Sequence, residues 1–155
     1  MRRTYLKESQ KMKRSYKEEY QYWLDSPALG EEEWKELSAI AEDEKEIESR
    51  FFAPLEFGTA GLRGVMATGL NRMNIHVIRW ATQAFAAVIK AEGEEACKKG
   101  VVVCYDCRLN SERFAREAAG VMAANGIRVR IFDALRPTPE LSFAVMHYGA
   151  TAGIN

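Results

Sequence analysis

The stretch VVVCYDCRLNSERFAREAAGVMAANGIRVRIF, residues 101–132, is the clearest indication of the fold class of this 155-residue chain. It opens on Val101–Tyr105, an unbroken apolar run that is typical of a strand covered on both faces in a parallel sheet. A helix is expected over 111–124, where the apolar residues share one face, and Asn125-Gly126 ends it. A second strand then follows over 127–132. Strand, helix and strand with short links predict a βαβ unit.

Further elements are expected on both sides of this unit. Apolar residues recur at helical spacing from Asn74 to Glu92, with Asn74 as a candidate N-cap. Thr138, between two prolines, is expected to cap a helix over 140–148, and a new strand begins within 149–155. A strand or hairpin is expected over 57–70. The predicted fold class is α/β: a three-layer α/β/α sandwich whose sheet is mixed but mostly parallel.

A helical extension is expected ahead of this domain. Two helices, Lys7–Leu24 and Glu31–Arg50, are separated by the turn-forming run DSPALG. The second helix is rich in glutamate and carries one narrow apolar stripe that would pack on the body of the protein. The stripe consists of Trp34, Leu37, Ile40 and Ile47. These features predict an extension over 1–50 and an α/β domain over 51–155.

The composition excludes several classes of protein. The chain is 47% hydrophobic and 28% charged with zero formal net charge, so it lacks the basic excess of a nucleic-acid-binding protein. No apolar run is long enough to span a bilayer, and the basic N-terminus has no apolar core behind it. We therefore expect a cytoplasmic protein without nucleic-acid or membrane partners. Three cysteines, an odd number, argue against a disulfide scaffold.

The cysteines and histidines provide no catalytic pattern. Cys104 and Cys107 form a C-x-x-C that crosses a strand end and lacks further zinc ligands, so two reduced, partly buried thiols are expected. His147 lies near the end of a helix, where its protonated form would be favoured. No nucleophile with a base beside it is evident.

The loop Asp106–Asn110 follows the first predicted strand, and ligands of open α/β sheets bind at the carboxyl ends of strands. Two interpretations remain open. Asp106 and Arg108 can pair and hold the shape of the loop, or Arg108 can order a neighbouring anion-binding loop.

The stretch FGTAGLRG, residues 57–64, is the second candidate site. Its regularly spaced glycines, among them Gly61, would let the backbone turn and bring N–H groups close to a ligand. Arg63 would add a permanently charged donor for phosphate, and Thr59 a hydroxyl. The alternative is a glycine-rich turn with Arg63 in a salt bridge. Spacing alone leaves both open, because the run matches neither a Walker A loop nor G-x-G-x-x-G.

Several ordered motifs together resemble the first domain of the α-D-phosphohexomutases, specifically their phosphoglucomutase/phosphopentomutase branch. The resemblance covers roughly residues 50–155, and the helical extension also looks like that branch. The motifs are FGTAGLRG (57–64), NRMN (71–74), YDCR (105–108) with Ser111, PTPE (137–140) and AGI (152–154).

The resemblance implies a mutase that moves a phosphoryl group between the C1 oxygen and the terminal hydroxyl of a sugar phosphate. A phosphoserine would donate the group, a bisphosphate would be the intermediate, and Mg²⁺ would offset the developing charge. Glucose 1,6-bisphosphate would be the activator. Residues that match the family's phosphate site are Thr59, Gly61 and Arg63, with Arg63 as electrostatic support, while Asp106 and Arg108 match supporting positions.

The resemblance also implies that the nucleophilic serine loop and the metal loop would follow Asn155. The chain is then expected to be the N-terminal part of a phosphoglucomutase, inactive alone, with the remaining domains and the sugar phosphate as partners. Alternatives are a phosphopentomutase or phosphomannomutase of the same family, or a non-catalytic α/β module that binds sugar phosphates or other proteins. Substrate preference and oligomeric state stay open.

Overall fold

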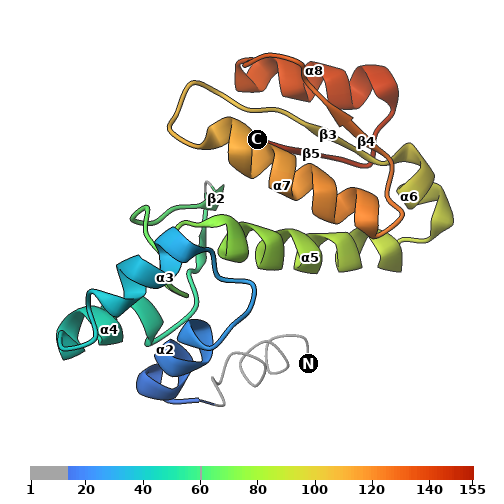
Figure 1. Cartoon of the computed structure of the whole chain (residues 1–155). Coiled ribbons are helices and arrows are strands. Elements are labelled where there is room, and N and C mark those ends of the chain that lie inside the picture. The colour runs from blue at the N-terminus through green and yellow to red at the C-terminus, as the bar shows by residue number, and fades with distance from the viewer. Residues whose placement is uncertain (1–13, 60) are drawn as a thin grey trace. The chain divides into compact units, whose positions relative to one another are not determined.

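The computed structural model describes residues 14–59 and 61–155, which form two compact units divided between Asn74 and Ile75 (Figure 1). In its described residues, the N-terminal unit has three short helices and a small antiparallel hairpin. Its elements are α2 (Tyr16–Leu24), α3 (Glu31–Ser38), α4 (Glu44–Phe51), β1 (Phe57–Gly58) and β2 (Gly61–Leu62). The domain boundary expected at residue 51 concerns the limits of a family domain and stays a prediction.

Helix α2 begins at Tyr16, within the range expected for the first helix. Ser15 caps it, because the Ser15 hydroxyl accepts a hydrogen bond of 3.3 Å from the Glu18 backbone N–H. The Glu18 carboxylate in turn accepts one of 2.7 Å from the Ser15 backbone N–H, which completes a capping box. The part of the expected helix over 7–13 lies outside the described residues.

The single helix expected over 31–50 is wrong, since the structure has two helices there. Helix α3 ends at Ser38, and Asp43 begins α4 by accepting a 3.1 Å hydrogen bond from the Glu46 backbone N–H to its carboxylate. The sequence analysis did not identify the Asp43 cap, because the continuous charge of this stretch concealed the break.

The core of the N-terminal unit is aromatic and aliphatic. Phe51 is completely buried, and the rings of Tyr20 and Trp23 meet it edge-on at centroid distances of 5.6 and 5.7 Å. Trp34 does not belong to the packed stripe that was expected, because 49% of it is exposed. The buried residues of this core are Tyr20, Leu37, Ile47 and Phe51.

The C-terminal unit is an α/β structure around a parallel sheet. In this sheet β3 lies between β4 and β5 and runs parallel to both, with Val102 opposite Arg130 on one side and Gly153 on the other. The elements of the unit are α5 (Ile75–Ala91), α6 (Glu94–Lys99), β3 (Val101–Val103), α7 (Ser111–Ala124), β4 (Val129–Ile131), α8 (Thr138–Tyr148) and β5 (Ala152–Ile154).

Helices cover both faces of this sheet. Figure 1 shows α5 and α7 side by side on one face and α8 on the other. Alternate residues of β3 point to opposite faces, so Val101 and Val103 pack under α5 and α7 while Val102 packs under α8. The predicted α/β/α fold class is thereby confirmed.

Element boundaries differ from the predictions in detail. The strands β3 and β4 are shorter than expected, and α6 was not anticipated. The predicted helix over 111–124 and the strand before Asn155 are confirmed. Thr138 is the first residue of α8 and Pro137 its N-cap, so the expected capping role of Thr138 is wrong.

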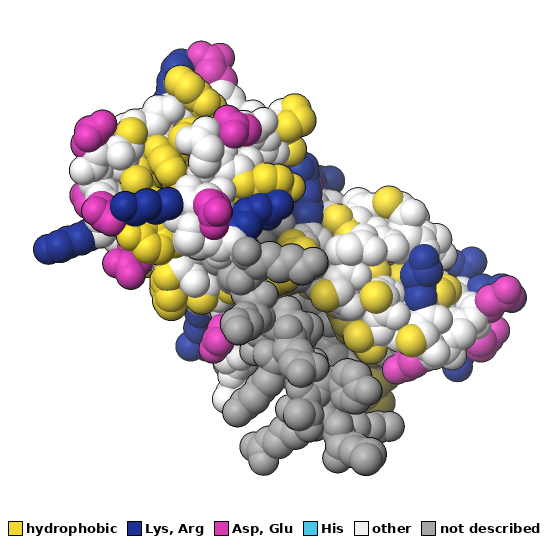
Figure 2. All heavy atoms as spheres, turned by 90° about the horizontal axis from the view of Figure 1, so that it is seen from below, with side chains coloured by type: hydrophobic (Ala, Val, Ile, Leu, Met, Phe, Trp, Pro, Cys, Tyr) yellow, Lys and Arg dark blue, Asp and Glu magenta, His cyan; other side chains and the backbone are white. Residues whose placement is uncertain are grey.

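The surface carries both charge signs. On the face shown in Figure 2, Lys and Arg side chains are interspersed with Asp and Glu and form no large single-sign region. Within residues 14–59 and 61–155 there is no helix with the length and apolar character that crossing a membrane requires.

Candidate functional site

The FGTAGLRG stretch forms the β1–β2 hairpin. Phe57 pairs with Leu62 and Gly58 with Gly61 in antiparallel register, and position 60 is outside the described residues. Gly61 has a φ of +95°, a backbone conformation that residues with a Cβ rarely adopt. The sequence therefore places glycine where the return strand requires it.

The polar groups of this hairpin face solvent. Arg63 is exposed, and its guanidinium makes no hydrogen bond or ion pair with any residue that the structure describes. The Thr59 hydroxyl is likewise exposed and forms no bond to the described part of the chain. The salt bridge that was the alternative interpretation of Arg63 is thus absent among these residues. An exposed, planar guanidinium of this kind can donate two parallel hydrogen bonds to the oxygens of a phosphate.

The second candidate loop follows β3, and here the predicted pair is present. The Arg108 Nε donates a hydrogen bond of 2.7 Å to the Asp106 carboxylate, and the Arg108 backbone N–H donates another of 3.0 Å. The Arg108 N–H bond lowers the pKa of Asp106, with further lowering by Ser111 and the Arg108 side chain outweighing a smaller desolvation effect. Asp106 is therefore ionised near neutral pH, and its main contact is within its own loop.

The carboxyl edge of the sheet gathers further polar groups that the sequence analysis did not assign. The Ser111 hydroxyl, at the start of α7, accepts a 3.1 Å hydrogen bond from the Asp106 backbone N–H. The Asn155 amide, after β5, donates a 2.9 Å bond to the Thr138 hydroxyl at the start of α8. Two helix N-termini lie at this edge, where N–H groups and helix dipoles favour anions. The strand-to-helix order of the sequence was the signal for this arrangement.

The predicted site residues thus fall into two groups. Thr59, Gly61 and Arg63 share one hairpin of the N-terminal unit, and Asp106 and Arg108 share one loop of the C-terminal unit. Sequence analysis missed Thr138 and Asn155 as edge residues, because their contact joins segments 17 positions apart.

The thiols differ in their surroundings. Cys104 is buried, and its thiol donates a hydrogen bond of 3.3 Å to the Arg136 carbonyl. Burial raises the pKa of the Cys104 thiol, so this group is protonated and unreactive. Cys107 is exposed, which corrects the expectation that both thiols are partly buried.

The expected magnesium ion was assigned to residues outside this chain. Among residues 14–59 and 61–155 no three His, Cys, Asp or Glu side chains come together as metal ligands, and the Asp106 carboxylate is held by Arg108. The described residues therefore do not make up a magnesium-binding set.

Comparison with known proteins identifies a family and several relatives. Residues 54–155 match the family described as phosphoglucomutase/phosphomannomutase, alpha/beta/alpha domain I. The phosphopentomutase of Homo sapiens is 40% identical over 141 residues, which is 85% of this chain and 23% of the relative. The phosphoglucomutase of Staphylococcus saprophyticus is 39% identical over 111 residues, covering 72% of this chain and 20% of the relative.

A probable phosphoribomutase of Schizosaccharomyces pombe is 37% identical over 114 residues, covering 74% of this chain and 19% of the relative. No solved structure gives a significant match. The chain spans about a fifth of the length of the human, staphylococcal and fission-yeast relatives. Because the family match covers residues 54–155, the chain belongs to the phosphoglucomutase/phosphomannomutase family, with its α/β/α domain I in that region.

Proposed function

We propose that this chain is the N-terminal part of a phosphohexomutase and supplies one side of its phosphate site. The proposal rests chiefly on the match of residues 54–155 to domain I of the family. In the complete enzyme a phosphoserine would transfer its phosphoryl group to a sugar phosphate, and a bisphosphate intermediate would return one group to the serine. Mg²⁺, when bound by other parts of the enzyme, would neutralise charge on the transferring group.

Within this scheme the β1–β2 hairpin would bind and orient the phosphoryl oxygens. The support is the exposure of Arg63 and the absence of any described partner for its guanidinium. A donor that is already aimed at the developing charge stabilises a transition state without reorganisation. Thr59 would contribute a hydroxyl, while Asp106 and Arg108 would keep the loop after β3 in shape.

The substrate is proposed to be glucose 1-phosphate, converted to glucose 6-phosphate. A pentose 1-phosphate is the second candidate, because the human relative is named phosphopentomutase and its match extends over 141 residues. Selectivity between the two sugars would be determined by a loop outside the chain.

A coupled assay with Mg²⁺ and glucose 1,6-bisphosphate tests the proposal in the full-length protein that contains these residues. Arg63→Ala should reduce kcat by about a hundredfold, the loss typical of one electrostatic donor. Arg128→Ala, which removes an exposed arginine beside β4, should leave kcat unchanged. Equal kcat values for Arg63→Ala and wild type would remove Arg63 from the site. Turnover by the 155-residue chain alone would overturn its assignment as an inactive part.

A further inference from the structure

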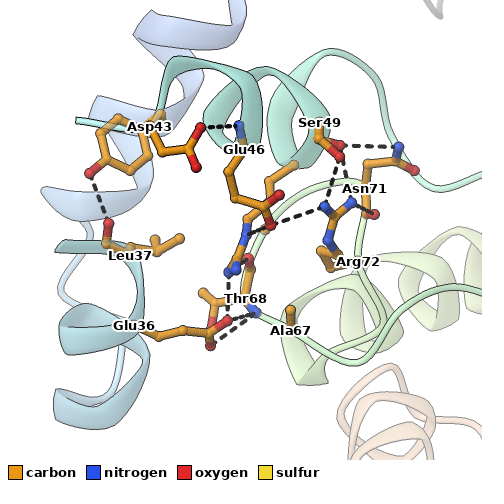
Figure 3. A network of polar contacts seen from close by, with 12 residues as sticks. Glu36, Leu37, Asp43, Glu46, Ser49, Ala67, Thr68, Asn71 and Arg72 are labelled. Atoms are coloured by element: carbon orange, nitrogen blue, oxygen red, sulfur yellow. Dashed lines mark hydrogen bonds and ion pairs between the residues drawn. The ribbon is translucent and has the colours of Figure 1, made fainter. Parts of the chain in front are cut away.

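A network of charged side chains joins α3 and α4 to the stretch that follows the hairpin (Figure 3). We call it the Arg50 network. Its members are Glu36, Glu46, Ser49, Arg50, Thr68 and Arg72.

Arg50 is at the centre of this network. Only 10% of its side chain is exposed, and its guanidinium bonds to the Glu36 carboxylate at 2.5 Å, the Glu46 carboxylate at 2.8 Å and the Thr68 carbonyl at 3.0 Å. Each bond has a defined direction, so together they fix the position of α4 relative to both α3 and Thr68.

While Arg50 bonds to the Thr68 carbonyl, Glu36 accepts hydrogen bonds from the Thr68 hydroxyl and backbone N–H. The Thr68 hydroxyl donates to the Glu36 carboxylate at 2.5 Å, and the Thr68 backbone N–H lies 3.2 Å from both oxygens. Gly69 follows with a φ of +140°, and a Cβ there would come within 2.9 Å of the Arg50 Cβ. The chain after the hairpin therefore passes directly against Arg50.

Arg72 forms the second connection. Its guanidinium donates to the Ser49 hydroxyl at 2.8 Å and to the Ser49 carbonyl at 3.1 Å. A longer contact of 3.3 Å reaches Glu46. In addition, the Asn71 N–H donates to the Arg50 carbonyl at 2.7 Å. The segment after the hairpin is thus bonded to α4 through both its side chains and its backbone.

The residues on either side of the hairpin are hydrogen-bonded to the segment 70–73 that follows it. Before the hairpin, the Leu55 N–H donates to the Leu70 carbonyl at 3.2 Å. After it, the Met73 N–H donates to the Val65 carbonyl at 2.8 Å. The hairpin itself is largely exposed, so its base at Leu55 and Val65 is the part that the rest of the N-terminal unit restrains.

We propose that the Arg50 network positions the hairpin so that Arg63 can reach phosphate, with Glu36 and Arg50 as positioning residues. This inference rests on the proposed function of Arg63. The helical extension would then be a working part of the phosphate site, although none of its residues touches substrate. A charged network suits this purpose, because directional bonds specify one arrangement, whereas apolar contacts permit several.

Hydrogen exchange on the 155-residue chain tests the positioning directly. Glu36→Gln should speed exchange of the amides over 57–65 by about tenfold while those of β3 stay protected, because only local opening becomes easier. Glu48→Gln is the matched control, since that exposed carboxylate on α4 makes no hydrogen bond or ion pair within the described chain. Unchanged exchange over 57–65 in Glu36→Gln would overturn the proposal.

A double-mutant cycle in the full-length enzyme tests the link to Arg63. Glu36→Gln should lower kcat by about tenfold alone but by less than about twofold when Arg63 is already alanine, because residues that act together are not additive. Equal losses in both backgrounds would overturn the positioning role. Should Glu36→Gln fail to fold, Thr68→Val breaks the same contact with a smaller change and is expected to give the same pattern.

A separate result would refute the proposed function: a kcat of Arg63→Ala equal to that of the wild-type enzyme. In that case faster exchange over 57–65 would still support the restraint of the hairpin, and its absence would refute it.

Discussion

Arg50 and Glu36 lie 14 positions apart and form an ion pair in which the Arg50 Nη1 approaches the Glu36 Oε1 to 2.5 Å. The arginine is nearly enclosed, whereas 39% of the glutamate side chain is exposed. A guanidinium enclosed in this way depends on its carboxylates, because without them it would be a charge removed from water.

Loss of this pair should destabilise the protein. We expect Arg50→Ala to lower the free energy of unfolding by about 2–3 kcal/mol, below the usual range for a fully buried pair because Glu36 keeps some water contact. Urea denaturation of the 155-residue chain measures this. Arg116→Ala, which removes an exposed i,i+4 pair with Glu112, is the control and should change nothing measurable. Similar losses of unfolding free energy in the two variants would show that the enclosure of Arg50 does not contribute to stability.

Acid should weaken the same network. Burial raises the pKa of Glu36, but hydrogen bonds from Thr68 and Arg50 outweigh it, so the pKa is lowered from its ordinary value of 4.5. The pKa of Glu46 is also lowered, first by its hydrogen bond from Arg50. A carboxylate whose pKa is lower in the folded than in the unfolded protein stabilises the fold above the unfolded value and loses this contribution as pH falls through the folded one.

Stability should therefore decline as pH falls below 4.5, and the double variant Glu36→Gln/Glu46→Gln should decline less steeply. Urea midpoints between about pH 7 and about pH 3 measure the slopes. Parallel slopes for variant and wild type would contradict the assignment of this acid sensitivity to Glu36 and Glu46.

Two glycines should respond to alanine in opposite directions. Gly100, before β3, has a φ of +73°, and a Cβ there would lie 2.0 Å from the Arg128 carbonyl oxygen. Gly100→Ala should lower the free energy of unfolding by more than about 2 kcal/mol, because strain and a backbone clash add. Gly120 lies within α7 with open space around it, so Gly120→Ala should raise stability by up to about 1 kcal/mol. Thermal unfolding of the two variants measures these changes. A change of the same sign in both would be inconsistent with the structure.

Asp106 should matter more for activity than for stability. The pair with Arg108 lies at the surface, so Asp106→Asn should change the free energy of unfolding by less than about 1 kcal/mol. In the full-length enzyme the same substitution should lower kcat, because the loop after β3 would lose its shape. Unaltered kcat would mean that this loop does not support the phosphate site.

The βαβ unit could be predicted because its signals are local. Its signals each act over a few residues: the apolar run Val101–Tyr105, the helical spacing over 111–124 and the Asn125-Gly126 stop. The structure confirms the two strands and the helix of this unit, with both strands shorter than expected. The break between α3 and α4 was missed, since an aspartate cap inside a glutamate-rich run is easily taken for one more helical charge.

The candidate site was predictable only in part. Glycine spacing placed a turn at Gly61, and the structure shows why glycine is needed there. That Arg63 has no partner among the described residues could not be known from its neighbours in sequence, because any carboxylate of the chain could have folded against it.

The fold class, the family and the order of strands and helices in the C-terminal unit, apart from α6, could be predicted because they depend on short-range patterns and on motifs read in order. Which charges are enclosed depends on how the chain packs in three dimensions. Arg50 meets Glu36 and Thr68 across 14 and 18 positions of chain, and no local periodicity encodes such contacts. They arise when helices pack and exclude water, so that each buried charge must find its partner.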